Sequence, residues 1–146
     1  MLENLVRHKD QDEEALLRTG SWFIFDQPDL KPVLPLAVKT VLEVRNSPAW
    51  QELVSGEVQL TEVPFGVRST DGKTLLFGVL DLVTKRSEAW QIVDYKSDVT
   101  PLKHLIKRYG GQIVPYANHW AQITGEPVDF AGIFRVRSQE LSEDLR

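Results

Sequence analysis

The chain has 146 residues, of which 42% are hydrophobic and 26% are charged, and this is typical of one globular domain spanning residues 1–146. It contains no cysteine, which excludes disulfides, thiolate zinc sites and iron–sulfur clusters, so a metal would be held by carboxylate, imidazole, carbonyl or water. The formal net charge of −4 gives no global attraction to nucleic acid, and such a partner would need a local basic patch.

The amino-terminal part, residues 1–55, has helical patterning. An acidic helix is expected over about residues 2–18, and its charged start is unlike a signal sequence. A Pro- and Asp-rich piece, residues 25–35, is predicted to be a loop. Helical spacing resumes over about residues 36–53, with an interruption near Ser47-Pro48. Because no apolar stretch approaches the ~20 residues that cross a bilayer, we expect a cytoplasmic protein without a membrane partner.

The rest of the chain alternates between β-prone and helical patterns. The β-prone runs lie at about residues 58–63, 74–84, 90–96 and 130–136. Turns at residues 69–72 and 85–88 should join the first three runs in antiparallel fashion. A helix of about 22 residues should follow, with Thr100 as N-cap, Pro101 in its first turn and an interruption at Gly110-Gly111. The order α-α-β-β-β-α-β predicts an α/β domain with a mixed central β-sheet flanked by helices, its core at residues 56–137 and a tail at 138–146.

The second β-prone run contains a carboxylate, Asp81, among apolar side chains. Its apolar neighbours are Phe77, Val79 and Val83 on one strand face and Leu76, Leu80 and Leu82 on the other. Both faces are therefore expected to be buried around Asp81. A buried carboxylate must be paired, hydrogen-bonded, protonated or bound to a metal. By itself, Asp81 could also be a strand-end residue that a backbone turn or an arginine satisfies.

The third run carries Asp94 and Lys96 two residues apart, hence on one face. If the hairpin around Ser87 is in register, Asp81 and Asp94 meet at one end of the sheet, where they repel unless a cation lies between them. Such oxygen ligands suit Mg²⁺ or Mn²⁺, which polarises a scissile phosphate and acidifies a bound water that a lysine can position or activate. This chemistry favours a phosphodiester substrate. The alternative is an exposed Asp–Lys pair of little consequence.

Side chains of the following helical segment could hold a nucleic-acid backbone. Gln112 and Tyr116 lie one helical turn apart and could clamp phosphates without reading bases, although they could equally mark the edge of the core. Lys103, Lys107 and Arg108 form a local basic patch that could bind DNA phosphates. The alternative for this patch is a solvated helix face.

Three ordered motifs carry a family resemblance. They are Gly78-Val79-Leu80-Asp81-Leu82, Ile92-Val93-Asp94-Tyr95-Lys96-Ser97-Asp98 and Gln112-Ile113-Val114-Pro115-Tyr116. They resemble the G-x-x-D, D-Y-K and Q-x-x-x-Y motifs of RecB/AddA-type nucleases in the PD-(D/E)XK superfamily. Glu62-Val63-Pro64-Phe65 is similar to the E-x-P-F strand of the same family, so the resemblance covers about residues 58–136.

The resemblance implies a restriction-endonuclease-like PD-(D/E)XK core and a metal-dependent DNA exonuclease. Asp81 and Asp94 would ligate Mg²⁺ or Mn²⁺, with the Tyr95 carbonyl as a further ligand. Lys96 would serve the attacking water.

The resemblance also implies partners. Gln112 and Tyr116 would contact DNA, and the family usually works joined to a helicase motor in DNA repair and recombination. The sequence has no GxxxxGK[ST] phosphate loop, so the motor would be another domain or subunit.

One family element departs from the pattern: the histidine of a G-x-x-x-H-x-x-L-E-like helix that completes the metal shell. Leu2-Glu3 resembles the tail of this motif and would place the histidine before Met1, so we expect the chain to be a fragment of a longer polypeptide. His8, His104 and His119 do not match and are expected on the surface or on helix faces.

Two other functions stay open at this stage. One is a nuclease-like module that binds DNA or a protein without catalytic activity. The other is a plain interaction domain of a helicase complex, without affinity for divalent metals or DNA.

Overall fold

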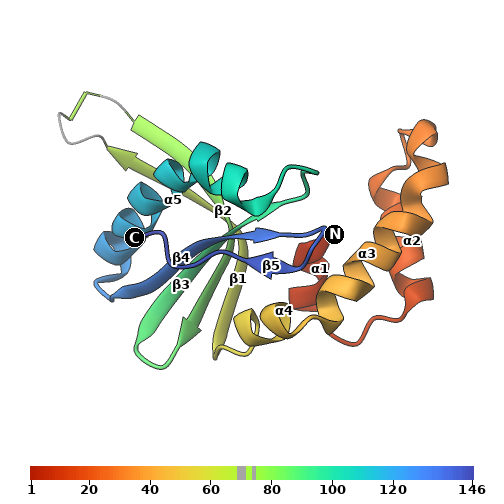
Figure 1. Cartoon of the computed structure of the whole chain (residues 1–146), viewed down its shortest axis with the longest axis horizontal. Coiled ribbons are helices and arrows are strands. Elements are labelled where there is room, and N and C mark those ends of the chain that lie inside the picture. The colour runs from red at the N-terminus through yellow and green to blue at the C-terminus, as the bar shows by residue number, and fades with distance from the viewer. Residues whose placement is uncertain (69–71, 74) are drawn as a thin grey trace.

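The computed structural model describes residues 1–68, 72–73 and 75–146, and only the backbone of Val67 and Leu76. The helices are α1 (Leu2–Arg7), α2 (Glu13–Phe23), the 3-10 helix η1 (Pro28–Val33), α3 (Leu34–Asn46), α4 (Pro48–Leu53) and α5 (Leu102–Thr124). The strands are β1 (Val58–Arg68), β2 (Leu75–Arg86), β3 (Ala89–Lys96), β4 (Val128–Arg135) and β5 (Glu140–Leu141). Within the described residues they form one sheet in the order β1-β2-β3-β4-β5. Only β3 and β4 pair in parallel, so the expected mixed sheet flanked by helices is confirmed (Figure 1).

The amino-terminal part divides into more helices than expected. The single helix expected over residues 2–18 is two helices, because the Asp12 side chain accepts a hydrogen bond from the Ala15 N–H at 2.8 Å and starts α2. The expected interruption near Ser47-Pro48 is confirmed, since Ser47 ends α3 and caps α4 through the Trp50 N–H. Most of the loop expected at residues 25–35 is occupied by η1.

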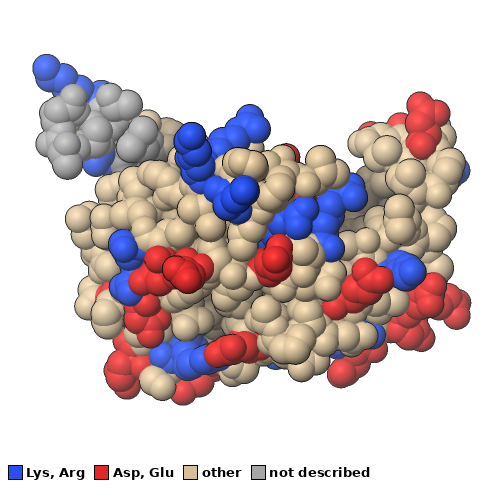
Figure 2. Space-filling model, in the orientation of Figure 1, with Lys and Arg blue, Asp and Glu red and all other residues tan. Residues whose placement is uncertain are grey.

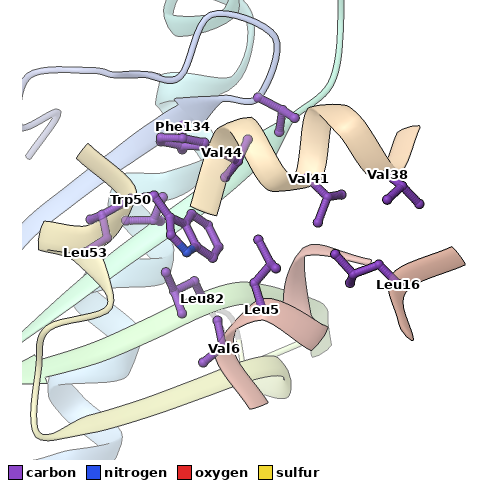
Figure 3. Packing of buried hydrophobic residues seen from close by; sticks show 12 residues of the cluster. Leu5, Val6, Leu16, Val38, Val41, Val44, Trp50, Leu53, Leu82 and Phe134 are labelled. Carbon is purple, nitrogen blue, oxygen red and sulfur yellow. The ribbon is translucent and has the colours of Figure 1, made fainter. Parts of the chain in front are cut away.

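Helices α1 to α4 cover one face of the sheet. Trp50 is 1% exposed, and its ring centroid lies 5.7 Å from that of Phe134 and 5.6 Å from that of Tyr95. Figure 3 shows the Trp50 indole among side chains from these helices and from the sheet, including Leu82. We call this group of buried residues the helical cluster. Its members are Leu5, Val6, Leu16, Val38, Val41, Val44, Trp50, Leu53, Leu82, Val93, Phe134 and Val136.

Helix α5 covers the opposite face. Its buried residues include Ile113, Ala117 and Trp120, at the spacing of one helical face, and they pack on sheet residues such as Leu80 and Ile92. We call this second group the α5 cluster. The N-cap is Pro101 rather than Thr100, and no side chain among the described residues caps the helix.

The expected interruption of this helix at Gly110-Gly111 is wrong, because α5 continues through both glycines and through Pro115. Gly110 is buried, and a Cβ there would meet Leu145 at 3.6 Å, so the small residue lets the helix approach the carboxy-terminal segment. Tertiary packing thus outweighs the local preference against helix at these positions. The helix ends at Gly125, which has the left-handed φ of 70° that favours glycine.

The hairpins set the register of the sheet. Strands β2 and β3 meet at a two-residue turn, Ser87-Glu88, in which Ser87 has a φ of 54°. The antiparallel pairing expected for β1, β2 and β3 is confirmed, although residues 69–71 of the other expected turn lie outside the described residues. Strand β1 extends past the expected residue 63 to Arg68, and it tolerates Pro64 because β1 is an edge strand.

The carboxy-terminal residues 138–146, expected as a tail, lie along β4. They include β5, and the Leu145 N–H donates to the Ala131 carbonyl at 2.9 Å. The Ala131 N–H in turn donates to the Asp144 carboxylate at 3.0 Å. None of the helices in the described part of the chain is long and apolar enough to cross a membrane.

Candidate active site

Neighbouring strands bring Asp81 and Asp94 to the same end of the sheet. The register pairs Leu82 of β2 with Val93 of β3, and Asp81 and Asp94 are the next residues on the two strands. Here the Tyr95 N–H donates to Asp81 Oδ2 at 2.8 Å, so a side chain takes the place of a backbone partner. The register expected for this hairpin is therefore observed, and the two carboxylates follow it.

The sheet changes its facing at Asp81. Leu80 packs in the α5 cluster, whereas Leu82, two residues further on, packs in the helical cluster. Side chains two residues apart share a face in a regular strand, so the alternation is broken between them. On the partner strand Glu62 has a φ of 52°, and the described β1–β2 ladder continues in register on both sides but omits Glu62 and Asp81.

This break corrects one expectation about the surroundings of Asp81. Both faces of β2 were expected to be buried here, but the Phe77 and Val79 side chains are 76% and 52% exposed. Beyond Asp81, only the face that turns toward α5 is covered, where Leu80 is 3% exposed. Asp81 thus lies at the boundary between a core strand and a projecting hairpin (Figure 1).

The environment of Asp81 disfavours its negative charge. Burial raises the pKa of the Asp81 carboxyl above its ordinary value, and the negative charges of Asp94 and Glu62 add to the rise. The hydrogen bond from Tyr95 and the positive charge of Lys96 oppose this shift of the pKa but do not cancel it. A cation next to Asp81 would therefore be favourable.

The Asp94 carboxylate faces Lys96. Lys96 Nζ lies 2.5 Å from Asp94 Oδ2, and the two side chains are 20% and 29% exposed. Although it is buried, Asp94 Oδ2 has no partner with hydrogen-bond geometry among the described residues, so the contact with the ammonium is ionic. The same ammonium lies 4.6 Å from the centroid of the Tyr109 ring.

A crevice between the sheet and α5 connects this pair to the helix. It is lined by Asp94, Tyr109, Gln112, Ile113, Tyr116 and Ile133. Two residues expected at the site, Gln112 and Tyr116, therefore lie beside Asp94. The Tyr116 ring packs edge-on against Phe65 of β1, with 4.7 Å between centroids.

Sequence reasoning missed Tyr109. Its signal was available, because Tyr109, Gln112 and Tyr116 follow the spacing i, i+3 and i+7 and so lie on one face of α5.

The expected basic patch lies on the first half of α5. Lys103, Lys107 and Arg108 are all exposed. The Arg108 guanidinium carbon lies 5.1 Å from the centroid of the Tyr109 ring. Figure 2 shows Lys and Arg gathered along the upper part of the molecule, where α5 begins and the β1–β2 hairpin projects, and Asp and Glu mainly below and over α2. The negative net charge is thus unevenly distributed, which a polyanion can exploit.

Tyr95 offers the site its backbone rather than its ring. The ring packs on Trp50 in the helical cluster, on the face opposite α5. Burial, with the charges of Asp81 and Glu3, raises the pKa of the Tyr95 hydroxyl well above its ordinary value. The hydroxyl therefore stays protonated and cannot exchange protons near neutral pH.

The donor set at this end of the sheet fits a hard divalent cation. It consists of the two carboxylates of Asp81 and Asp94, one with a raised pKa and the other with a buried oxygen that only an ammonium approaches. Across the described residues, no three His, Cys, Asp or Glu side chains are grouped so that they could hold a metal ion together. Backbone carbonyls and water would have to complete the coordination.

The three histidines lie where the sequence suggested. His8 and His104 are exposed, and His119 is half-buried on α5.

Comparisons with known proteins agree with this arrangement. Residues 1–144 match a family model described as the PD-(D/E)XK nuclease superfamily, whose members generally use divalent metal ions. One subunit of the ATP-dependent helicase/nuclease of Levilactobacillus brevis is similar, with 27% identity over 107 residues. That alignment covers 60% of this chain but only 8% of the relative, so the chain corresponds to a small part of that protein.

Proposed function

This chain belongs to the PD-(D/E)XK nuclease superfamily, and on that premise we propose that it is a Mg²⁺- or Mn²⁺-dependent deoxyribonuclease that degrades DNA as an exonuclease. The observation that carries the proposal is the meeting of Asp81, Asp94 and Lys96 where β2 and β3 adjoin the crevice under α5. Two carboxylates and an ammonium in this arrangement suit phosphodiester hydrolysis.

The proposed roles follow from the donor types. Asp81, Asp94 and the Tyr95 carbonyl would hold the metal, which when bound polarises the scissile phosphate and lowers the pKa of a water. Lys96 would donate hydrogen bonds to the attacking water and hold it in line with the phosphorus. Because its ammonium already lies 2.5 Å from Asp94 Oδ2, Lys96 is within reach of anything that this carboxylate binds.

The helix would supply the DNA contacts. Gln112 and Tyr116 can donate hydrogen bonds from the wall of the crevice to phosphate oxygens, without reading bases. Lys103, Lys107 and Arg108 would contact phosphates further along the strand. Binding should therefore depend on salt more than on base sequence.

The similarity to part of a helicase/nuclease supports a partner. We propose that the domain works joined to a helicase motor in DNA repair and recombination. The motor would deliver DNA to the exposed basic side of α5.

Cleavage tests the proposal. Linear duplex and single-stranded DNA are incubated with the chain in Mn²⁺, and Asp94→Ala and Lys96→Ala should each abolish degradation. Asp129→Ala is the matched control, because Asp129 is an exposed carboxylate on the adjacent strand β4. Degradation that survives Asp94→Ala would contradict the site. DNA binding without degradation would instead favour a nuclease-like binding module, and neither activity would favour a plain interaction domain.

A further inference from the structure

The Lys96 ammonium has two neighbours that fix its position. One is the Asp94 carboxylate, 2.5 Å from Nζ, and the other is the Tyr109 ring, whose centroid lies 4.6 Å away. A cation within about 6 Å of an aromatic centroid is attracted by the ring's quadrupole. The lysine side chain is 20% exposed, so water competes only partly with the two contacts.

The ring is needed because a carboxylate alone does not orient a lysine. Lysine has a long flexible stem and a point charge, so one ion pair leaves its ammonium free to swing around the oxygen. Tyr109 comes from α5 and Asp94 from β3, and both line the same crevice. Contacts from two elements restrict the ammonium on two sides.

Tyr109 also contacts the basic patch. The Arg108 guanidinium carbon lies 5.1 Å from the same ring centroid, within cation–π range. The ring is therefore flanked by a cation from the crevice and by a cation from the exposed side of the helix.

We propose that Tyr109 is a positioning residue that seats the Lys96 ammonium beside Asp94 and links it, through Arg108, to the phosphate-binding side of α5. The proposal rests on the proposed nuclease function for the role of Lys96, but the seating itself is a property of the folded chain. The feature of Tyr109 that does this is its aromatic face, so phenylalanine should replace it and leucine should not.

Nuclear magnetic resonance of the whole chain tests the seating directly. Protons on the Lys96 ε-carbon, assigned with Lys96→Arg, should be shifted upfield by the ring in the unmodified chain and in Tyr109→Phe. In Tyr109→Leu the signal should return to the ordinary lysine position. Lys85 is an internal control, because its ammonium lies 5.5 Å from the centroid of the Trp90 ring, and its signal should stay constant in every variant that is folded.

Cleavage kinetics in Mn²⁺ test the consequence. Tyr109→Leu should lower kcat about three- to thirtyfold, the range that corresponds to a cation–π contact, while Tyr109→Phe stays within about twofold of the unmodified chain. Arg108→Ala should act mainly on KM, because it removes a phosphate contact and leaves the Tyr109 ring in place.

The outcomes separate the two proposals. An ordinary Lys96 signal in the unmodified chain, or an upfield signal that survives Tyr109→Leu, would overturn the seating. An unchanged kcat in Tyr109→Leu, in a chain that cleaves DNA and loses cleavage with Asp94→Ala, would overturn the positioning role while the nuclease function stands. If the chain does not cleave DNA, the nuclease function fails, and the lysine signal still decides whether Tyr109 seats Lys96.

Discussion

Replacing Gly78 by alanine should destabilise the fold, although the glycine lies in a strand. A Cβ at Gly78 would lie 2.6 and 2.7 Å from two ring atoms of Phe65 and 3.2 Å from the Tyr116 hydroxyl oxygen. Carbon atoms pack at about 3.5–4.0 Å, so the Phe65 ring must retreat by roughly 1 Å. Such overpacking costs about 1–3 kcal/mol, whereas removing a strand glycine gains about 0.5–1 kcal/mol. We expect a net loss of about 1–2 kcal/mol in the free energy of unfolding.

Urea denaturation measures this loss, and two further variants identify its cause. In a Phe65→Leu background the added methyl should cost little, because the ring is gone. Gly111→Ala is the control, since nothing among the described residues beyond its own helix and chain neighbours lies within 4 Å of a Cβ there, and it should stabilise the helix by about 0.5–1 kcal/mol. If Gly78→Ala is as stable as the unmodified chain, or stays destabilised with Phe65→Leu, the close packing does not explain the glycine.

Two other expectations concern DNA and pH. The Lys103/Lys107/Arg108 triple alanine variant should reduce the slope of log K against log salt for duplex DNA by about 2.7, which is 0.9 for each lost phosphate contact, and an unchanged slope would return the patch to a solvated face. Because burial raises the pKa of Asp81 in the folded chain, folding is favoured below the ordinary aspartate pKa and loses stability as the pH rises through the raised value. Asp81→Asn should therefore raise the metal-free unfolding temperature at neutral pH and abolish stabilisation by Mn²⁺, and a lower unfolding temperature would contradict the cause given for the shift.

The sequence was informative where local pattern and tertiary structure agree. The spacing between Asp81 and Asp94 and the turn at Ser87 specify a hairpin register, and this register is observed. The spacing of Gln112 and Tyr116 specifies a shared helix face, and both residues line the crevice. The roles of all four remain predictions.

Other features depend on contacts that are distant in the sequence. The helix continues through Gly110-Gly111 because its buried face packs on the sheet, which helix propensity does not record. The face change at Asp81 depends on the left-handed backbone of Glu62 on another strand. Tyr109 matters only because a lysine of β3 lies against its ring.

The central claim is that Asp81 and Asp94 bind one divalent metal ion, and a crystal soaked in Mn²⁺ tests it most directly. The account predicts one anomalous peak between the two carboxylates, with oxygen ligands at about 2.0–2.6 Å that include the Tyr95 carbonyl, and Lys96 close to the site. Asp94→Asn should weaken or remove the peak. An unmodified crystal without manganese at this place, or with manganese bound only elsewhere on the chain, would contradict the claim.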